Sequence, residues 1–136
     1  MSALISRFEG GRFGARYLAY FDCFNRQLFY EAHDVLEELW LESRGKPEGD
    51  FYKGLIQLAG AFVHIQKGRP QPAASLLRLA EQNLQKYPRV QHELDLGRVE
   101  ALIQFWRERV EAPQFQTKEV SAKDWPQLDL SDRRRT

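Results

Sequence analysis

The stretch DFYKGLIQLAGAFVHIQK, residues 50–67, decides the fold. With successive residues 100° apart, its apolar side chains occupy more than half of the circumference of a helix, which is more than a surface helix needs. Such a helix must be covered on most of its sides, so we expect it at the centre of a bundle. The narrow polar stripe that remains consists of four residues: Lys53, Gln57, Gly60 and His64.

Four further stretches have the apolar spacing of helices, and none alternates convincingly as a strand does. The predicted helices span about residues 12–25, 29–43, 72–87 and 97–110. Pro72 suits the first turn of the fourth helix because the missing N–H has no helical partner there, and Pro88 ends that helix. The sequence therefore predicts an all-α protein, a compact bundle of about five helices around a central apolar third helix.

The chain has 136 residues, a length that fits one domain. We expect residues 1–11 to form a flexible leader, residues 12–112 the helical bundle, and residues 113–136 an extended C-terminal tail. The tail is polar and is expected to dock on the bundle through three isolated apolar residues: Phe115, Trp125 and Leu128.

Composition and charge exclude several classes of protein. Hydrophobic residues make up 43% of the chain and charged residues 29%, as in ordinary globular proteins. The 20 basic residues are matched by 19 acidic ones, so a general nucleic-acid binder is not indicated. No apolar stretch approaches the roughly 20 residues that span a bilayer, and the single cysteine, Cys23, cannot form an internal disulfide. We expect a cytoplasmic protein that binds neither nucleic acid nor membrane.

The polar candidates for a site begin in FNRQLFYEAHDVLEELW, residues 24–40. The helix predicted at 29–43 buries one apolar face, and His33 and Glu37 fall together on one flank beside Trp40, because residues four apart are neighbours on a helix. Glu31 lies toward the opposite flank. If this helix packs antiparallel to the central helix, the first flank faces the stripe that carries Gln57 and His64.

These residues also carry a resemblance to a known family. The run FNRQLFYEAHDVLEELW followed by FYKGLIQLAGAFVHIQKG is similar to the small helical proteins called domain of unknown function 309, over about residues 17–87. The resemblance implies a helical bundle whose activity is unassigned. It also implies a set of signature positions: Asn25, Glu31, His33, Glu37, Trp40, Gly54, Gln57 and His64. Gln27 stands where the family often has glycine, and Pro72 replaces a glycine-like position.

The cluster of His33, Glu37, Gln57 and His64 allows three interpretations. First, His33 and Glu37 form an ion pair that steadies the helix. Second, His33, Glu37 and His64 supply three ligands to a divalent metal, as catalytic zinc sites do, although no cysteine supports the site. Third, Glu37 orients His33, which moves a proton on a ligand.

We therefore expect a protein of unknown function, most simply a structural or protein-interaction module with a buried polar cluster between the second and third helices. Its partner would be another protein or a second copy of the chain. The alternative is a small enzyme or a protein that binds a metal or small molecule. The catalytic and metal-ligand candidates are His33, Glu37 and His64. The ligand-binding candidates are Glu31, Trp40, Lys53 and Gln57.

Other residues are predicted to be structural. We expect Trp40 and Trp106 to be core anchors, since both lie on apolar helix faces. Asn25 falls where the first helix should end and is expected to cap backbone groups there. His92, in the connection QHELDLG, is expected to face solvent.

Overall fold

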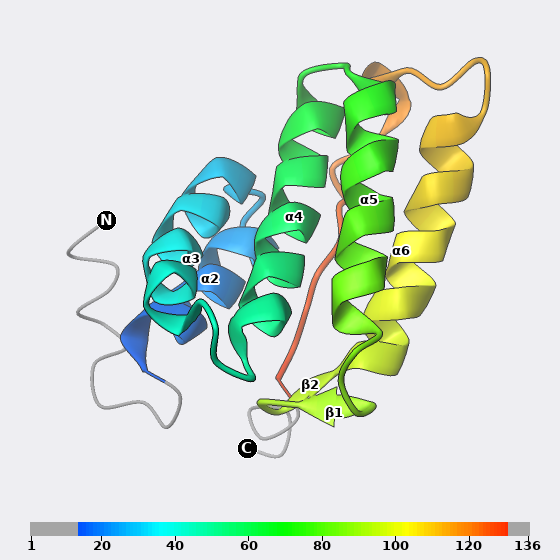
Figure 1. The fold of residues 1–136 in the computed structure, drawn as a ribbon. Helices are drawn as coiled ribbons and strands as arrows, with labels where there is room; N and C mark the ends of the chain where they lie inside the picture. The colour runs from blue at the N-terminus through cyan, green and yellow to red at the C-terminus, as the bar shows by residue number, and fades with distance from the viewer. Residues whose placement is uncertain (1–13, 131–136) are drawn as a thin grey trace.

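The computed structural model describes residues 14–130, and its elements carry the labels of Figure 1. These residues form five α-helices, a two-stranded hairpin and one 3-10 turn: α2 (Ala15–Asn25), α3 (Phe29–Ser43), α4 (Gly49–Gln66), α5 (Pro70–Leu84), β1 (Val90–Gln91), β2 (Leu94–Asp95), α6 (Leu96–Glu111) and η1 (Thr117–Glu119). The predicted all-α bundle is confirmed. The leader predicted at residues 1–11 lies outside the described residues.

The central position predicted for the third helix is also confirmed. Figure 1 shows α4 with α3 on one side and α5 on the other, and α6 beyond α5. The Phe62 ring of α4 stacks on Phe29 of α3 at 5.2 Å and meets Trp106 of α6 edge-on at 5.2 Å. Trp106 is only 2% exposed, so its predicted role as a core anchor is confirmed. These rings join three helices in one apolar core.

α4 and α5 pack closely at Gly54. A Cβ atom added at Gly54 would lie 2.8 Å from both Cγ and Cδ2 of Leu84 on α5, a distance that real Cβ atoms do not adopt. Gly54 therefore lets α4 and α5 approach closely. α5 itself begins at Pro70, two residues before the predicted start, because a proline is well accepted in the first turn of a helix.

The hairpin β1–β2 was not predicted. Its turn residues His92 and Glu93 have φ values of 49° and 65°, the left-handed backbone that a tight two-residue hairpin turn requires. The sequence lacks the Asn-Gly or Asp-Gly pair that usually indicates such a turn. The antiparallel pairing places Val90 opposite Asp95.

The prediction that His92 faces solvent is wrong, because an aromatic cluster surrounds its ring. His92 is half-buried, with its ring 5.1 Å from Phe51 and 5.7 Å from both Tyr17 and Tyr52. The Tyr17 hydroxyl also donates a hydrogen bond to the His92 carbonyl at 2.9 Å. The hairpin is therefore packed against α2 and α4.

The segment after α6 returns behind α4 and α5 toward the hairpin (Figure 1). Trp125 stacks on Trp106 at 5.9 Å with an interplanar angle of 16°, and Leu128 and Leu130 are buried. Leu130 ends the described segment in a β-bridge with Leu94 of the hairpin. This segment thus covers the core on the side away from the viewer.

Asn25 holds this segment in place, so the prediction that it caps α2 is wrong. Its side-chain Nδ2 donates to the Leu128 carbonyl at 2.8 Å, and its Oδ1 accepts from the Leu128 N–H at 2.7 Å. The amide satisfies both backbone groups of one residue, as a neighbouring strand would. A signature residue of the helical region therefore binds a segment more than 100 positions later in the chain.

None of the helices between residues 14 and 130 combines the length and the apolar character that crossing a membrane would require.

The first prediction concerns Asn25. Asn25→Ala should lower the free energy of unfolding by about 1–3 kcal/mol, because two hydrogen bonds are lost and the Leu128 backbone groups are left without partners. Urea unfolding followed by circular dichroism measures the change. Asn25→Asp keeps the acceptor for the Leu128 N–H and loses the donor. Its change in the free energy of unfolding should therefore differ from that of Asn25→Ala. An Asn25→Ala protein as stable as the parent would contradict this role.

The second prediction concerns pH. Burial lowers the pKa of His92 below its ordinary value of 6.5, partly opposed by the Glu48 carboxylate. The unfolded chain therefore takes up this proton at a higher pH than the folded chain, and stability should fall as pH drops below about 6.5. Urea unfolding at pH 7.5, 6.5 and 5.5 measures the slope.

The matched variants are His92→Asn, which suits a left-handed backbone, and Tyr17→Phe, which keeps the imidazole. His92→Asn should reduce the pH slope, whereas Tyr17→Phe should lower stability and retain the slope. Equal slopes in the parent and His92→Asn proteins would show that His92 does not contribute.

Candidate functional site

The candidate residues meet on one side of the boundary between α3 and α4. We call this surface the α3/α4 face and define it by nine residues: Tyr30, His33, Glu37, Trp40 and Arg44 of α3, and Lys53, Gln57, Gly60 and His64 of α4. Residues of the two helices approach each other at two places on this face. The His33 ring carbon Cδ2 lies 3.8 Å from the position of a Cβ built at Gly60, and the Lys53 Nζ lies 5.9 Å from the centre of the Trp40 ring.

The polar residues of the α3/α4 face are not buried, so this part of the prediction is wrong. His33, Glu37, Gln57 and His64 are each half-buried, and Lys53 is exposed. Among residues 14–130 the single buried polar side chain is that of Ser43. The reason is geometric: α3 and α5 pack on the two flanks of α4 and leave its polar stripe uncovered.

The expected ion pair between His33 and Glu37 does not form. None of the ion pairs or hydrogen bonds between described residues includes either side chain. The His33 ring instead stacks with Tyr30, one helical turn earlier, at 6.4 Å and an interplanar angle of 22°. The orientation of His33 is thus set by an aromatic neighbour and by the proximity of Gly60.

Gln57 belongs to a hydrogen-bond chain that reaches α5. Asn83 Nδ2 donates to Gln57 Oε1 at 2.8 Å, and Lys86 Nζ donates to Asn83 Oδ1 at 3.2 Å and to Asp50 at 2.7 Å. The Gln57 oxygen is therefore occupied, and its NH2 group makes no hydrogen bond to the rest of the described chain. Sequence reasoning missed Asn83, which lies beyond the helices that it compared.

His64 is electrostatically distinct from its neighbours. Burial lowers its pKa, and the nearby Arg69 and Lys67 lower it further. Its Nδ1 atom is buried and has no hydrogen-bond partner in the part of the chain that the structure describes. At neutral pH His64 is therefore an uncharged imidazole that can accept a proton or a hydrogen bond.

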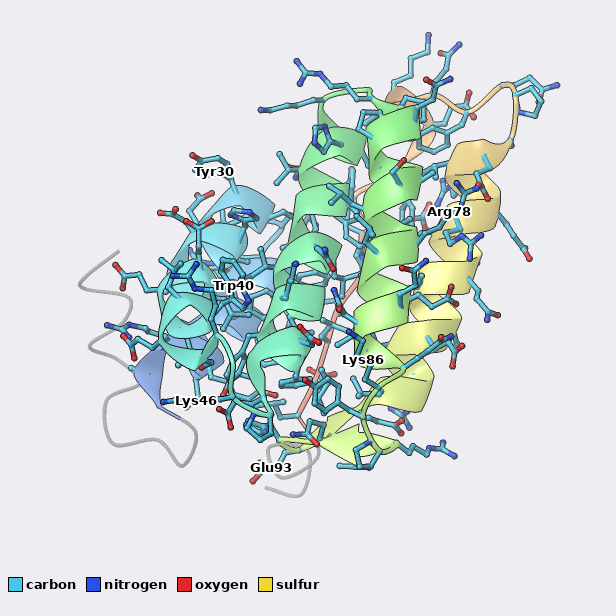
Figure 2. All side chains as sticks on the ribbon, in the orientation of Figure 1. Tyr30, Trp40, Lys46, Arg78, Lys86 and Glu93 are labelled. Atoms are coloured by element: carbon cyan, nitrogen blue, oxygen red, sulfur yellow. The ribbon has the colours of Figure 1, made fainter. Side chains whose placement is uncertain are left out.

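Trp40 is half-buried, not the enclosed core anchor that was predicted, and it packs against the core with part of its ring exposed. The Arg44 Cζ lies 5.6 Å from its ring centre and the Lys53 Nζ 5.9 Å. Neither cation forms an ion pair with any residue between 14 and 130. Figure 2 labels Trp40 on the side of α3 toward α4, and Tyr30, which is 64% exposed, farther along α3.

Glu31 is not part of the α3/α4 face. It lies in the first turn of α3, where a carboxylate is favoured by the helix dipole. Burial, together with the nearby charges of Asp22 and Glu31, raises the pKa of the Cys23 thiol on α2 to about 11. Glu31 therefore lies on the side of α3 toward α2. This is the flank opposite the α3/α4 face, as its helical position predicts.

A metal site gains no support from the geometry. Within residues 14–130 no group of three His, Cys, Asp or Glu side chains is arranged to hold a metal ion. Metal binding by His33, Glu37 and His64 therefore stays a prediction.

Part of this chain is similar to parts of two known proteins. An uncharacterized protein of Aquifex aeolicus (strain VF5) is 30% identical over 76 residues, which are 56% of this chain and 23% of that protein. The uncharacterized protein YpuF of Bacillus subtilis (strain 168) is 33% identical over 85 residues, 61% of this chain and 49% of that protein. The chain thus spans about a quarter and about half of these two relatives. No solved structure matches it significantly.

Residues 17–76 match the family described as Domain of unknown function (DUF309). The matched range includes every residue of the α3/α4 face and ends within α5, before Asn83. The resemblance predicted from the signature residues is therefore confirmed over α2, α3, α4 and the start of α5, in a family whose function is not assigned.

Proposed function

We propose that this chain is a protein-interaction module and that the α3/α4 face is its docking surface. The observation that carries the proposal is the partly exposed Trp40 ring with two cations beside it, Arg44 and Lys53, that have no carboxylate partner among the described residues. Trp, Tyr and Arg are the residues that most often dominate binding energy at protein interfaces. Tyr30 adds a second exposed ring to the same surface.

The residues of the α3/α4 face favour a partner with acidic and apolar side chains. A carboxylate on the partner would pair with Arg44 or Lys53 at the Trp40 end. Near the middle, a Cβ built at Gly60 would lie 3.4 Å from Leu76 Cδ1 and 3.8 Å from His33 Cδ2, so the glycine leaves a small gap between these side chains. The space beside Gly60 accepts a group of about the size of a methyl, and we infer a partner segment with an acidic residue near a small apolar one.

The comparisons support a modular role. In both curated relatives the region similar to this chain is only a part of a longer protein, 23% in one and 49% in the other. A folded unit that occurs beside different amounts of additional sequence suits a domain that joins or positions other proteins. The family match lies in the region from α2 to the start of α5.

The acid–base alternative has weaker support. It requires Glu37 to orient His33, yet His33 stacks on Tyr30 and makes no hydrogen bond to Glu37. His64 is uncharged and could accept a proton, and the Gln57 NH2 could hold a ligand, but no nucleophile accompanies them. His33, Glu37 and His64 therefore stay candidates without an assigned reaction.

The third prediction tests docking by site-specific photocrosslinking. The full chain, carrying a photoreactive phenylalanine analogue in place of Tyr30, should form a discrete adduct in its own cells. The matched control replaces Phe105, which is on α6 and 58% exposed, so both positions are accessible aromatic residues. Mass spectrometry identifies the adduct, and the purified partner is then titrated against the chain.

The double variant Arg44→Glu, Lys53→Glu should weaken binding of that partner at least tenfold, about 1.4 kcal/mol, without a loss of folding, since both side chains are exposed. Equal adducts from Tyr30 and Phe105 would indicate nonspecific capture. The proposal would be overturned if the analogue at position 30 formed no adduct. It would also be overturned if the partner bound the double variant as tightly as it binds the parent chain.

The fourth prediction compares two glycines of α4. Gly60→Ala should raise the free energy of unfolding by about 0.5–1 kcal/mol, because alanine favours a helix and the added Cβ meets only ordinary contacts. Gly54→Ala should lower it by about 1–3 kcal/mol, because the Cβ overlaps Leu84. Thermal and urea unfolding measure both changes.

Gly60→Ala should also weaken binding of the crosslinked partner, because the gap between His33 and Leu76 becomes smaller. A more stable variant with weaker binding would show that the glycine serves docking. Unchanged affinity would remove the gap from the proposed surface and leave Trp40 with its two cations as the contact.

A further inference from the structure

A second feature lies on the other side of α5, between α5, α6 and the residues that lead into the hairpin. It is a partly open cavity of about 570 Å3, within the 300–1,000 Å3 typical of small-molecule sites. Its apolar wall is formed by Leu84 of α5 and by Leu96 and Ile103 of α6. The volume and the wall suit the apolar body of a small molecule.

Two arginines line the end of the cavity near the hairpin, and both share one carboxylate. Arg89 Nε lies 3.5 Å from Asp95 Oδ1, and Arg98 Nε lies 3.8 Å from Asp95 Oδ2. The shorter contacts of Asp95 go elsewhere: its Oδ1 accepts from the backbone N–H groups of Gly97 at 2.9 Å and Arg98 at 3.2 Å. Asp95 caps α6 and leaves the pair of guanidinium groups incompletely neutralised.

The Arg89 side chain lies beside Gly97, in the first turn of α6. A Cβ built at Gly97 would lie 3.2 Å from Arg89 Nε, so the guanidinium rests over the first turn of α6 at the edge of the cavity. The Arg89 carbonyl accepts a hydrogen bond from the Leu96 N–H, which fixes the backbone at the same point. The cation is thus placed beside the apolar wall while its side chain remains 78% exposed.

The cavity is also lined by two carboxylates, of which Glu81 is paired with a cation and Glu100 is hydrogen-bonded to a neutral amide. Glu81 Oε1 pairs with Arg107 at 3.1 Å, and Glu100 Oε1 accepts from the Gln85 side chain at 3.2 Å. They lie on α5 and on the second turn of α6, beyond the arginines. The hairpin end of the cavity therefore carries two arginines with one shared carboxylate, whereas the negative charge of Glu100 lies on the second turn of α6 and has no cationic partner among the described residues.

We propose that this cavity binds a small organic monoanion, with its anionic group at Arg89 and Arg98 and its apolar body against Leu84, Leu96 and Ile103. Guanidinium groups bind carboxylates and other oxyanions through paired N–H donors, which suits this end of the cavity. The site is separate from the α3/α4 face, and all of its lining residues lie after residue 76, outside the family match.

The test uses two dyes of nearly the same shape on the full chain. 1-Anilinonaphthalene-8-sulfonate carries one negative charge, and N-phenyl-1-naphthylamine is the uncharged analogue. Fluorescence titration should show one site for the anionic dye and at least tenfold weaker binding of the neutral dye. Binding should weaken as salt is added, because the contact is between exposed charges.

Variants locate the site. Arg89→Gln with Arg98→Gln should weaken binding of the anionic dye at least tenfold and leave the affinity for the neutral dye unchanged. Arg26→Gln with Arg78→Gln is the matched control, since it removes the same charge from two exposed, singly paired arginines elsewhere. Ala101→Trp, at an exposed position of the cavity, should reduce binding of both dyes.

Several results would overturn the proposal. Equal affinity for the two dyes would mean an apolar cavity without anion selectivity. An equal effect of the two arginine pairs would mean a response to overall charge. Absence of binding by the anionic dye would mean that the cavity does not accept such a molecule. Circular dichroism of each variant verifies folding, and the two arginine pairs decide the outcome if Ala101→Trp does not fold.

Discussion

The structure depends on the burial of α4 on every side except one. Its apolar residues contact helices on both flanks, and rings such as Phe62 connect α3 to α6 through it. Each large apolar side chain removed from water contributes about 1.5–3 kcal/mol, so this helix supplies much of the driving force for folding. The connections that precede and follow α4 are short, which forces α3 and α5 to lie beside it. The polar stripe then remains as the uncovered part of the central helix.

Polar contacts between distant parts of the chain attach the hairpin and the C-terminal segment to α2. They fix positions that apolar burial alone would not determine. The Asn25 amide pairs with the backbone of Leu128, and the Tyr17 hydroxyl binds the carbonyl of His92. Both contacts start on α2 and fix a segment without helical structure. α2 therefore has two roles, because one side packs in the core and other positions anchor the hairpin and the C-terminal segment.

The difference between local helical patterns and contacts of distant residues explains what could be predicted from the sequence. Helical periodicity locates α4, and it places His33 and Trp40 on the flank of α3 that borders α4, because both properties are local. The exposure of His92 was predicted wrongly because its surroundings come from Tyr17, Phe51 and Tyr52, which no local pattern connects to it. The role of Asn25 was missed for the same reason. Gln27 shows an intermediate case: its φ of 65° accounts for the glycine expected there, but only the structure reveals the left-handed turn.

The two helix-interior glycines of α4 differ in how closely neighbouring side chains pack against them. Gly54 is required by the fold, since Leu84 occupies the space where a side chain would begin. Gly60 has no such requirement, because its surroundings would accept a Cβ at ordinary distances. A glycine inside a helix costs about 0.5–1 kcal/mol relative to alanine, and the space around Gly60 would accept the alanine Cβ. Its position between His33 and Leu76, on the uncovered side of the central helix, is the reason that Gly60 belongs to the docking surface proposed above.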